Sequence, residues 1–182
     1  MMKYIASLLF VILGFFFLRV EVYGVELESY KYIYFVEVEP GLKKATFYIN
    51  SEPFFHPLTR SMQIETARMQ FLLQQDAFAS NSWDVGYTLT AVTPNSLISN
   101  FRGDISVSST NLLFPTQFGR INANEQFVPI SHTTRWPGRV IIPRSTASVR
   151  VRTHNAAVHF MRSGWSTFST DVVGTVDLNW IW

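Results

Sequence analysis

The stretch YKYIYFVEVE, residues Tyr30–Glu39, decides the fold class of this chain. Aromatic and β-branched residues dominate it, and side chains of one character recur at every second position, which is the period of a β-strand. Pro40 and Gly41 then end the strand at a turn. One face of the strand holds Tyr30, Tyr32, Tyr34, Val36 and Val38, and the other holds Lys31, Ile33, Phe35, Glu37 and Glu39. The pattern predicts a long strand near the start of an all-β chain.

Further short strands are predicted along the rest of the chain. They are separated by turn signals, and they do not alternate with helical patterns. The predicted segments are Ala45–Asn50, Asp84–Val92, Asp104–Ser108, Arg139–Ile142, Ser148–Thr153 and Asp171–Trp182. A chain of 182 residues normally makes one domain. We therefore expect a single Ig-like β-sandwich of about seven strands.

Two regions are harder to assign. Ser61–Ala79 lacks Gly and Pro and is rich in Met, Gln, Ala and Leu, which favours a helix. Its apolar residues Ala67, Met69, Phe71 and Leu73 nevertheless alternate with polar ones, so we predict two short strands, with one helix as the alternative. Between Pro115 and Gly138, Pro and Gly residues interrupt any pattern, and little regular structure is expected there.

Residues 1–24 resemble a secretory signal peptide. Lys3 provides the positive charge that a signal peptide carries near its N-terminus, and the apolar run Tyr4–Leu18 is shorter than a membrane span. Val22 and Gly24 are small residues at the positions that a signal peptidase reads. We predict cleavage after Gly24 and export of the chain. A short membrane anchor is the alternative.

Composition narrows the function classes. The chain has no cysteine, which in an exported protein fits the bacterial envelope or surface and excludes zinc–thiolate sites and thiol catalysis. Removal of residues 1–24 leaves 13 basic and 12 acidic residues, a net charge of +1. Because the charge is near zero and there is no lysine-rich tract, nucleic acid is not an expected partner.

No catalytic motif stands out. The four histidines, His56, His132, His154 and His159, lack metal-ligand spacing. Ser166 lies in SGWST, which lacks the second glycine of a nucleophile elbow, and there is no glycine-rich phosphate loop. We predict no catalytic residues, no metal and no cofactor, and therefore a protein that is not an enzyme.

A weaker signal concerns anion or glycan binding. Arg150 and Arg152 share one face of a predicted strand, and Trp165 lies in a loop-like setting. Arginines of this kind bind acidic glycans or phospholipid headgroups, and an exposed tryptophan stacks on sugar rings. The alternatives are a solvated strand face for the arginines and core packing for the tryptophan.

The two ends of the mature chain give the clearest indication of function. Val176, Leu178, Trp180 and Trp182 share one face of the last predicted strand, so the chain begins and ends on alternating strands. A β-sandwich with an open edge can accept a strand from a neighbour, with backbone hydrogen bonds giving affinity and alternate side chains filling pockets. Such donation also protects an edge that would otherwise aggregate.

With its terminal segments YKYIYFVEVEPG and VVGTVDLNWIW, the chain resembles cysteine-free chaperone–usher fimbrial subunits of the colonisation-factor and common-pilus type. Val38-Glu39-Pro40 stands where those pilins have Val-Asp-Pro or a similar stop. The resemblance implies a signal peptide (1–24), a donor strand (25–40) and a sandwich domain (41–182) whose incomplete edge is completed by strand donation. It also implies passage through the periplasm to a surface fimbria, where the chain is a shaft, minor or tip-proximal subunit.

The resemblance assigns roles to the terminal residues. Tyr30, Tyr32, Tyr34, Val36 and Val38 would enter the neighbouring subunit, and Val176, Leu178, Trp180 and Trp182 would pair with a periplasmic chaperone. The implied partners are neighbouring subunits, that chaperone, an outer-membrane usher and a host glycan or protein receptor. Two alternatives stay open: a small outer-membrane β-barrel, because the last strand ends on an aromatic residue, and a secreted glycan-binding β-sandwich.

Overall fold

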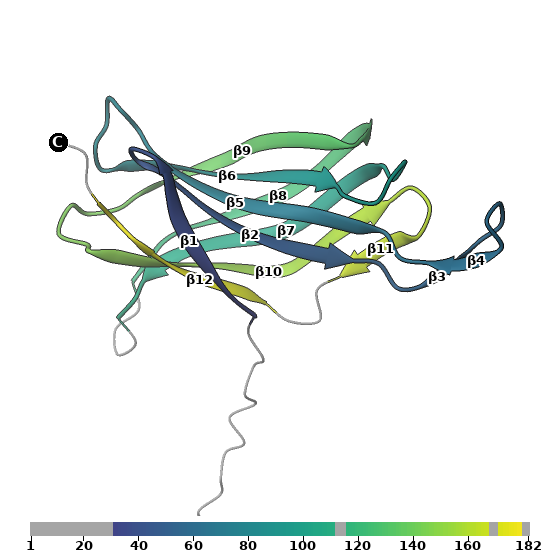
Figure 1. The fold of residues 1–182 in the computed structure, drawn as a ribbon. Coiled ribbons are helices and arrows are strands. Elements are labelled where there is room, and N and C mark those ends of the chain that lie inside the picture. The colour runs from purple at the N-terminus through teal and green to yellow at the C-terminus, as the bar shows by residue number, and fades with distance from the viewer. Residues whose placement is uncertain (1–30, 112–115, 168–170, 180–182) are drawn as a thin grey trace, which may run out of the picture.

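The computed structural model describes residues 31–111, 116–167 and 171–179, and every regular element within these ranges is a β-strand (Figure 1). The strands are β1 (Lys31–Glu39), β2 (Leu42–Asn50), β3 (Phe54–His56), β4 (Ser61–Gln63), β5 (Thr66–Gln75), β6 (Ser82–Ala91), β7 (Ile98–Ser109), β8 (Gln117–Ile130), β9 (His132–Ile141), β10 (Ser148–Phe160), β11 (Gly164–Thr167) and β12 (Val172–Asp177). The predicted all-β class is confirmed, with more strands than the seven expected. In these ranges no helix is long and apolar enough to span a membrane.

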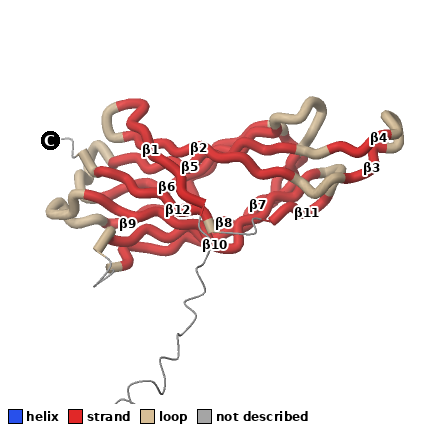
Figure 2. The backbone as a smooth tube through the Cα atoms, turned by 60° about the horizontal axis from the view of Figure 1, so that its bottom comes forward, coloured by secondary structure: helices blue, strands red, loops and turns tan. Residues whose placement is uncertain are grey.

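Ten strands form one sheet that folds over on itself. Along the sheet the order is β8-β7-β10-β12-β1-β2-β5-β6-β9, with β11 beside β10, and β3 and β4 form a separate hairpin. The views in Figures 1 and 2 show two layers, one containing β7, β8, β10 and β12 and the other containing β2, β5, β6 and β9. The rings of Tyr87 on β6 and Phe101 on β7 meet between the layers, with centroids 4.5 Å apart.

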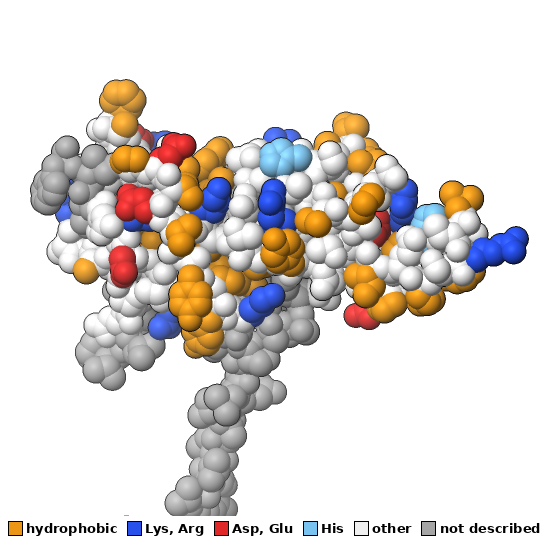
Figure 3. Space-filling view, viewed as in Figure 1, with side chains coloured by type: hydrophobic (Ala, Val, Ile, Leu, Met, Phe, Trp, Pro, Cys, Tyr) orange, Lys and Arg blue, Asp and Glu red, His pale blue; other side chains and the backbone are white. Residues whose placement is uncertain are grey.

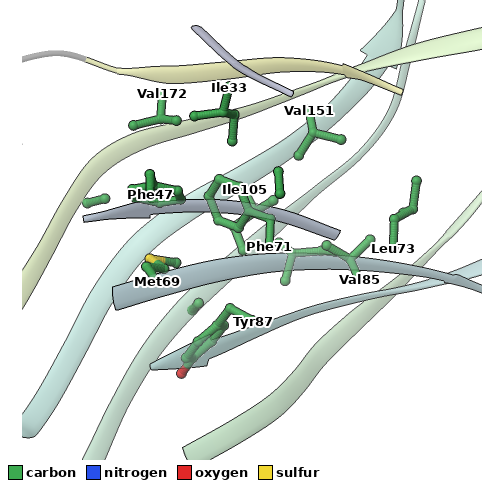
Figure 4. Close-up of a cluster of buried hydrophobic side chains, with 14 of the residues drawn as sticks. Ile33, Phe47, Met69, Phe71, Leu73, Val85, Tyr87, Ile105, Val151 and Val172 are labelled. Carbon is green, nitrogen blue, oxygen red and sulfur yellow. The ribbon is translucent and has the colours of Figure 1, made fainter. Parts of the chain in front are cut away.

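The core lies between these layers because each strand turns alternate side chains inward. On β5, Ala67, Met69, Phe71 and Leu73 are all buried. Figure 4 shows how side chains from both layers interdigitate, with Ile105 and Val151 opposite the β5 residues and Ile33 pointing into the cluster from β1. The result is a sandwich-like all-β fold whose sheet is nearly closed.

The two uncertain regions have different outcomes. Ser61–Ala79 contains β4 and β5 and no helix, which confirms the prediction of two strands. The expectation of little regular structure between Pro115 and Gly138 is wrong, since β8 and most of β9 lie there. These strands are the two ends of the sheet, where proline is tolerated because the missing N–H has no ladder partner to lose.

An unsealed seam separates β8 from β9. Among the described residues, β8 pairs only with β7, and β9 only with β6. Side chains fill the seam: Val140 packs over Gly119, and Ile121 packs over Gly138. Glu125 of β8 also forms an ion pair with Arg135 of β9.

A buried carboxylate ties three connecting segments together. Glu65, between β4 and β5, is 1% exposed. It accepts hydrogen bonds from the Ser96 hydroxyl at 2.6 Å and from the Ser163 backbone N–H and hydroxyl at 2.9 and 2.7 Å. Three donors offset the cost of burying the carboxylate. The network fixes the end of the sandwich from which the β3–β4 hairpin projects.

Candidate functional site

Strand β1 joins the two layers by changing partner halfway along its length. Its first half runs parallel to β12, from Lys31 opposite Val172 to Tyr34 opposite Thr175. Its second half runs antiparallel to β2, beginning with Phe35 opposite Ala45. Figure 1 shows β1 crossing diagonally between these neighbours. One segment at the N-terminal end of the described chain therefore closes the gap between β12 and β2.

Few side chains of β1 enter the core. Ile33 is 7% exposed and Phe35 is half-buried. The opposite face points away from the core: Tyr32, Tyr34, Val36 and Val38 are 70%, 86%, 57% and 43% exposed. Within its own chain, β1 therefore packs inward with Ile33 and Phe35, on the face opposite to the one that the sequence analysis assigned to the neighbouring subunit.

A groove opens where β1 diverges from β2. It encloses about 440 Å³, and its wall includes Tyr32, Tyr34, Val36 and Tyr48. Beyond Ala45, the edge of β2 that faces β1 pairs with no described strand. Figure 3 shows hydrophobic side chains along the line of β1. This side of the molecule thus combines an unpaired strand edge with an exposed apolar ridge.

A second groove lies between the end of β1 and the end of β12, and it is polar. Glu37 accepts hydrogen bonds from the Lys43 ammonium at 2.7 Å, the Gly41 backbone N–H at 3.1 Å and the Asn179 amide at 3.2 Å. These bonds, above all that from Lys43, lower the pKa of Glu37 from its ordinary value near 4.5 to about 2. The carboxylate therefore links β1, β2 and the segment after β12.

The connection between β1 and β2 is a tight turn at Pro40 and Gly41. Gly41 has φ of 75°, a left-handed conformation that glycine adopts without steric cost. Proline followed by such a glycine is typical of a type II turn. A two-residue connection keeps β1 beside its own β2 as long as the turn stays folded.

The predicted chaperone-pairing strand is only partly described. Val176 is buried on β12, and Leu178 just after it is buried too. Both pack in the core, and the Leu178 N–H donates to the Ala147 carbonyl oxygen at 2.8 Å. Tyr30, Trp180 and Trp182, which the sequence analysis also selected, lie outside the described residues.

The predicted anion or glycan residues are not gathered at one site. Arg152 forms an ion pair with Asp171 at 2.7 Å, and His154 contacts the same carboxylate. Trp165 pairs with His159, nine positions beyond Arg150 on β10, which is roughly 30 Å along a strand. The guanidinium over the Trp165 ring is instead that of Arg102, 4.5 Å from its centroid.

A polar groove on the outer face of β7, β8 and β10 was missed in the sequence. Its lining includes Arg102, Asp104, Asn122, Asn124 and Asn155. These residues lie on three strands, of which β7 and β10 were predicted in part and β8 not at all. Only the register between strands brings them together, and one sequence does not reveal register. Within the described ranges, no cluster of three or more His, Asp or Glu residues could hold a metal ion.

Comparisons with known proteins do not assign a family. No protein-family model matches the chain, and no curated protein matches it. Among solved structures, a DUF3823 family protein from Bacteroides ovatus is similar over 76% of this chain and 77% of its own, with 12% sequence identity and a TM-score of 0.29.

Proposed function

We propose that the chain is an exported subunit of a bacterial surface fibre and that copies assemble by exchanging β1. In the closed chain, β1 fills the gap between its own β12 and β2. In the fibre, β1 of one copy fills the same gap in the next copy. Export rests on the signal-peptide pattern in residues 1–24, and the fibre on the resemblance of the terminal strands to fimbrial subunits.

The observation that carries the proposal is the change of partner along β1. A strand that bridges two sheet edges leaves both edges open when it departs. Burial of a side chain such as Ile33 is worth roughly 1.5–3 kcal/mol, so detaching β1 costs a small part of the gross core energy. Exchange between copies recreates the lost contacts, which makes swapping of an identical element a low-cost route to assembly.

The turn at Pro40 and Gly41 acts as the hinge in this proposal. In the closed chain it folds back tightly, whereas exchange requires it to extend. A short hinge favours domain swapping because few residues have to change conformation for the strand to leave its own chain. Proline suits the extended state as well, since the residue before it is biased toward extended conformations.

The buried face of the exchanged strand follows from the closed chain. If exchange recreates the contacts of the closed chain, Ile33 and Phe35 enter the acceptor core. The ridge of Tyr32, Tyr34, Val36 and Val38 then stays outside and packs between subunits. This buried face differs from the sequence-based expectation that the tyrosine face enters the acceptor, and the experiment below distinguishes the two.

A pair of charge substitutions tests both the exchange and the buried face. Ile33→Asp places a carboxylate in the core and is expected to abolish oligomers, measured by light scattering after size-exclusion chromatography. Val36→Asp adds the same charge on the exposed face and is expected to leave the thermal midpoint unchanged within about 2 °C. If Val36→Asp abolishes oligomers and Ile33→Asp does not, the tyrosine face enters the acceptor core instead. If both variants form oligomers as readily as the unmodified chain, exchange of β1 is excluded.

A further inference from the structure

The polar groove lies on the outer face of the sandwich, away from β1. It encloses about 580 Å³ and is lined by side chains from β7, β8, β10 and β11. On β7 and β8 the register aligns Arg102 with Asn124 and Asp104 with Asn122. Because paired residues point to the same side of a sheet, these four side chains form a compact block.

A bulge in β10 adds a further amide to this block. Asn155 has φ of 51°, which asparagine tolerates better than most residues, and it interrupts the pairing of β10 with β7 between His154 and Ala157. The bulge turns Asn155 outward into the groove while Ala156 stays buried. Bulges re-aim side chains in this way beside functional sites. Thr167 on β11 completes the lining.

The amides of the groove have unused bonding capacity. The side chains of Asn122, Asn124, Asn155 and Thr167 make no hydrogen bond to any described residue, whereas Asp104 pairs with Arg120. Each amide offers two donors and an acceptor, which matches the adjacent hydroxyls of a sugar ring. A hollow whose polar groups converge without bonding one another is the expected form of a ligand site.

The groove also holds a positioned cation. Arg102 has no carboxylate partner within the described ranges, and its guanidinium lies over the Trp165 ring. Trp165 is fixed in turn by an edge-to-face contact with His159, whose Nδ1 is 2.7 Å from the Ser99 hydroxyl oxygen. The stack restrains Arg102 before a ligand binds. It leaves the edge of the guanidinium free to bind a carboxylate in a bidentate manner.

We infer that this groove binds a sugar acid, with Arg102 on the carboxylate and Asn122, Asn124 and Asn155 on the hydroxyls. Asp104 gives the groove a preference for a sugar acid over a simple anion. Its carboxylate, which is paired with Arg120, has lone pairs left to accept hydrogen bonds from hydroxyl groups, whereas sulfate brings charge without donors. A ligand with one carboxylate and several hydroxyls satisfies both features. The inference is independent of strand exchange, because the groove contains no residue of β1.

Titration calorimetry with two pairs of probes tests the inference on the purified protein. The first pair is 3′-sialyllactose and lactose, and the second is an oligogalacturonate and its methyl ester, so that each pair differs in carboxylate charge. We expect at least one acidic probe to bind and its neutral partner to bind about tenfold or more weakly. Inorganic sulfate should not compete. Binding of neither acidic probe, equal binding of the two partners in a pair, or full displacement by sulfate would overturn the inference.

Substitutions of groove residues test whether the sugar binds in this groove. Arg102→Gln and Asn124→Ala are each expected to weaken binding about tenfold, whereas Arg60→Gln on the β3–β4 hairpin should leave it unchanged. Trp165 is a positioning residue. Trp165→Phe, which keeps an aromatic face for Arg102, should therefore retain more affinity than Trp165→Leu at equal thermal midpoints. Unchanged binding in Arg102→Gln would place the sugar elsewhere.

Discussion

Gly174 of β12 lies directly against the ring of Phe35 of β1. A Cβ atom at position 174 would be 2.6 Å from Cε2 of that ring and 3.1 Å from Cγ1 of Ile33. Because real Cβ contacts are longer, the two apolar side chains of β1 occupy space that only glycine leaves free. This contact seats β1 across the gap between the layers.

Substitution of Gly174 is therefore expected to loosen β1 selectively. Gly174→Ala should destabilise the closed chain by about 1–3 kcal/mol through overpacking. Hydrogen exchange should accelerate in β1 more than in β5, because the open state detaches one strand and leaves the core strands paired. Phe35→Leu in the same chain should recover part of the loss, since neighbouring substitutions are not additive. Equal acceleration in β1 and β5 would show that β1 does not open alone.

Strain at the hinge should increase the exchanged population. Gly41→Ala puts a Cβ on a residue with φ of 75°, at a cost of about 1–2 kcal/mol in the folded turn. An extended hinge has no such strain, so the fraction of dimers and larger oligomers should rise. Gly164→Ala is the matched control, because Gly164 has φ of 82° and no atom within 4 Å of its added Cβ. It should lower the thermal midpoint without raising the oligomer fraction.

Acid should release β1. The pKa of Glu37 is lowered to about 2, so its hydrogen bonds stabilise the hairpin fully above its ordinary pKa near 4.5. That contribution is lost as the pH falls from 4.5 through 2. We expect oligomers to exchange subunits faster at about pH 3 than at about pH 6, followed by native mass spectrometry of isotope-labelled mixtures. Glu37→Gln should reduce the difference. The same acceleration in that variant would assign the effect to other carboxylates.

The sequence predicts where the strands lie along the chain better than it predicts which strands pair with one another. Alternation and the Pro40-Gly41 turn locate β1 and the hairpin that follows it, because both signals are local. Which face of β1 packs inward depends on its register with its neighbours, since a one-residue change of register reverses the two faces. Ile33, rather than the tyrosines, is buried because β12 offers Gly174 opposite it.

Other features depend on contacts between distant segments. Proline suggested loops in the region of β8 and β9, yet both are strands because they lie at the sheet ends. The polar groove depends on register and on the bulge at Asn155, which no local pattern in the sequence marks. Trp165 was a candidate on its own, but its partner Arg102 is 63 positions earlier and could not be found without the fold.

A disulfide trap across β1 and β12 tests strand exchange most directly. The natural chain has no cysteine, and Tyr34 is opposite Thr175 with both side chains exposed. Adjacent strand positions of this kind lie within the reach of a disulfide. Two single-cysteine proteins, Tyr34→Cys and Thr175→Cys, would be mixed, allowed to assemble and oxidised. A mixture of Arg60→Cys with Thr175→Cys measures random cross-linking.

Exchange predicts a cross-linked heterodimer that joins residue 34 of one copy to residue 175 of another, well above the control mixture. The double variant Tyr34→Cys/Thr175→Cys, kept dilute and monomeric, should form the same bond within one chain. Mass spectrometry of the linked peptides identifies the bond in both cases. If the double variant closes internally while the mixture gives no heterodimer above the control, β1 stays in its own chain and the proposed assembly is wrong.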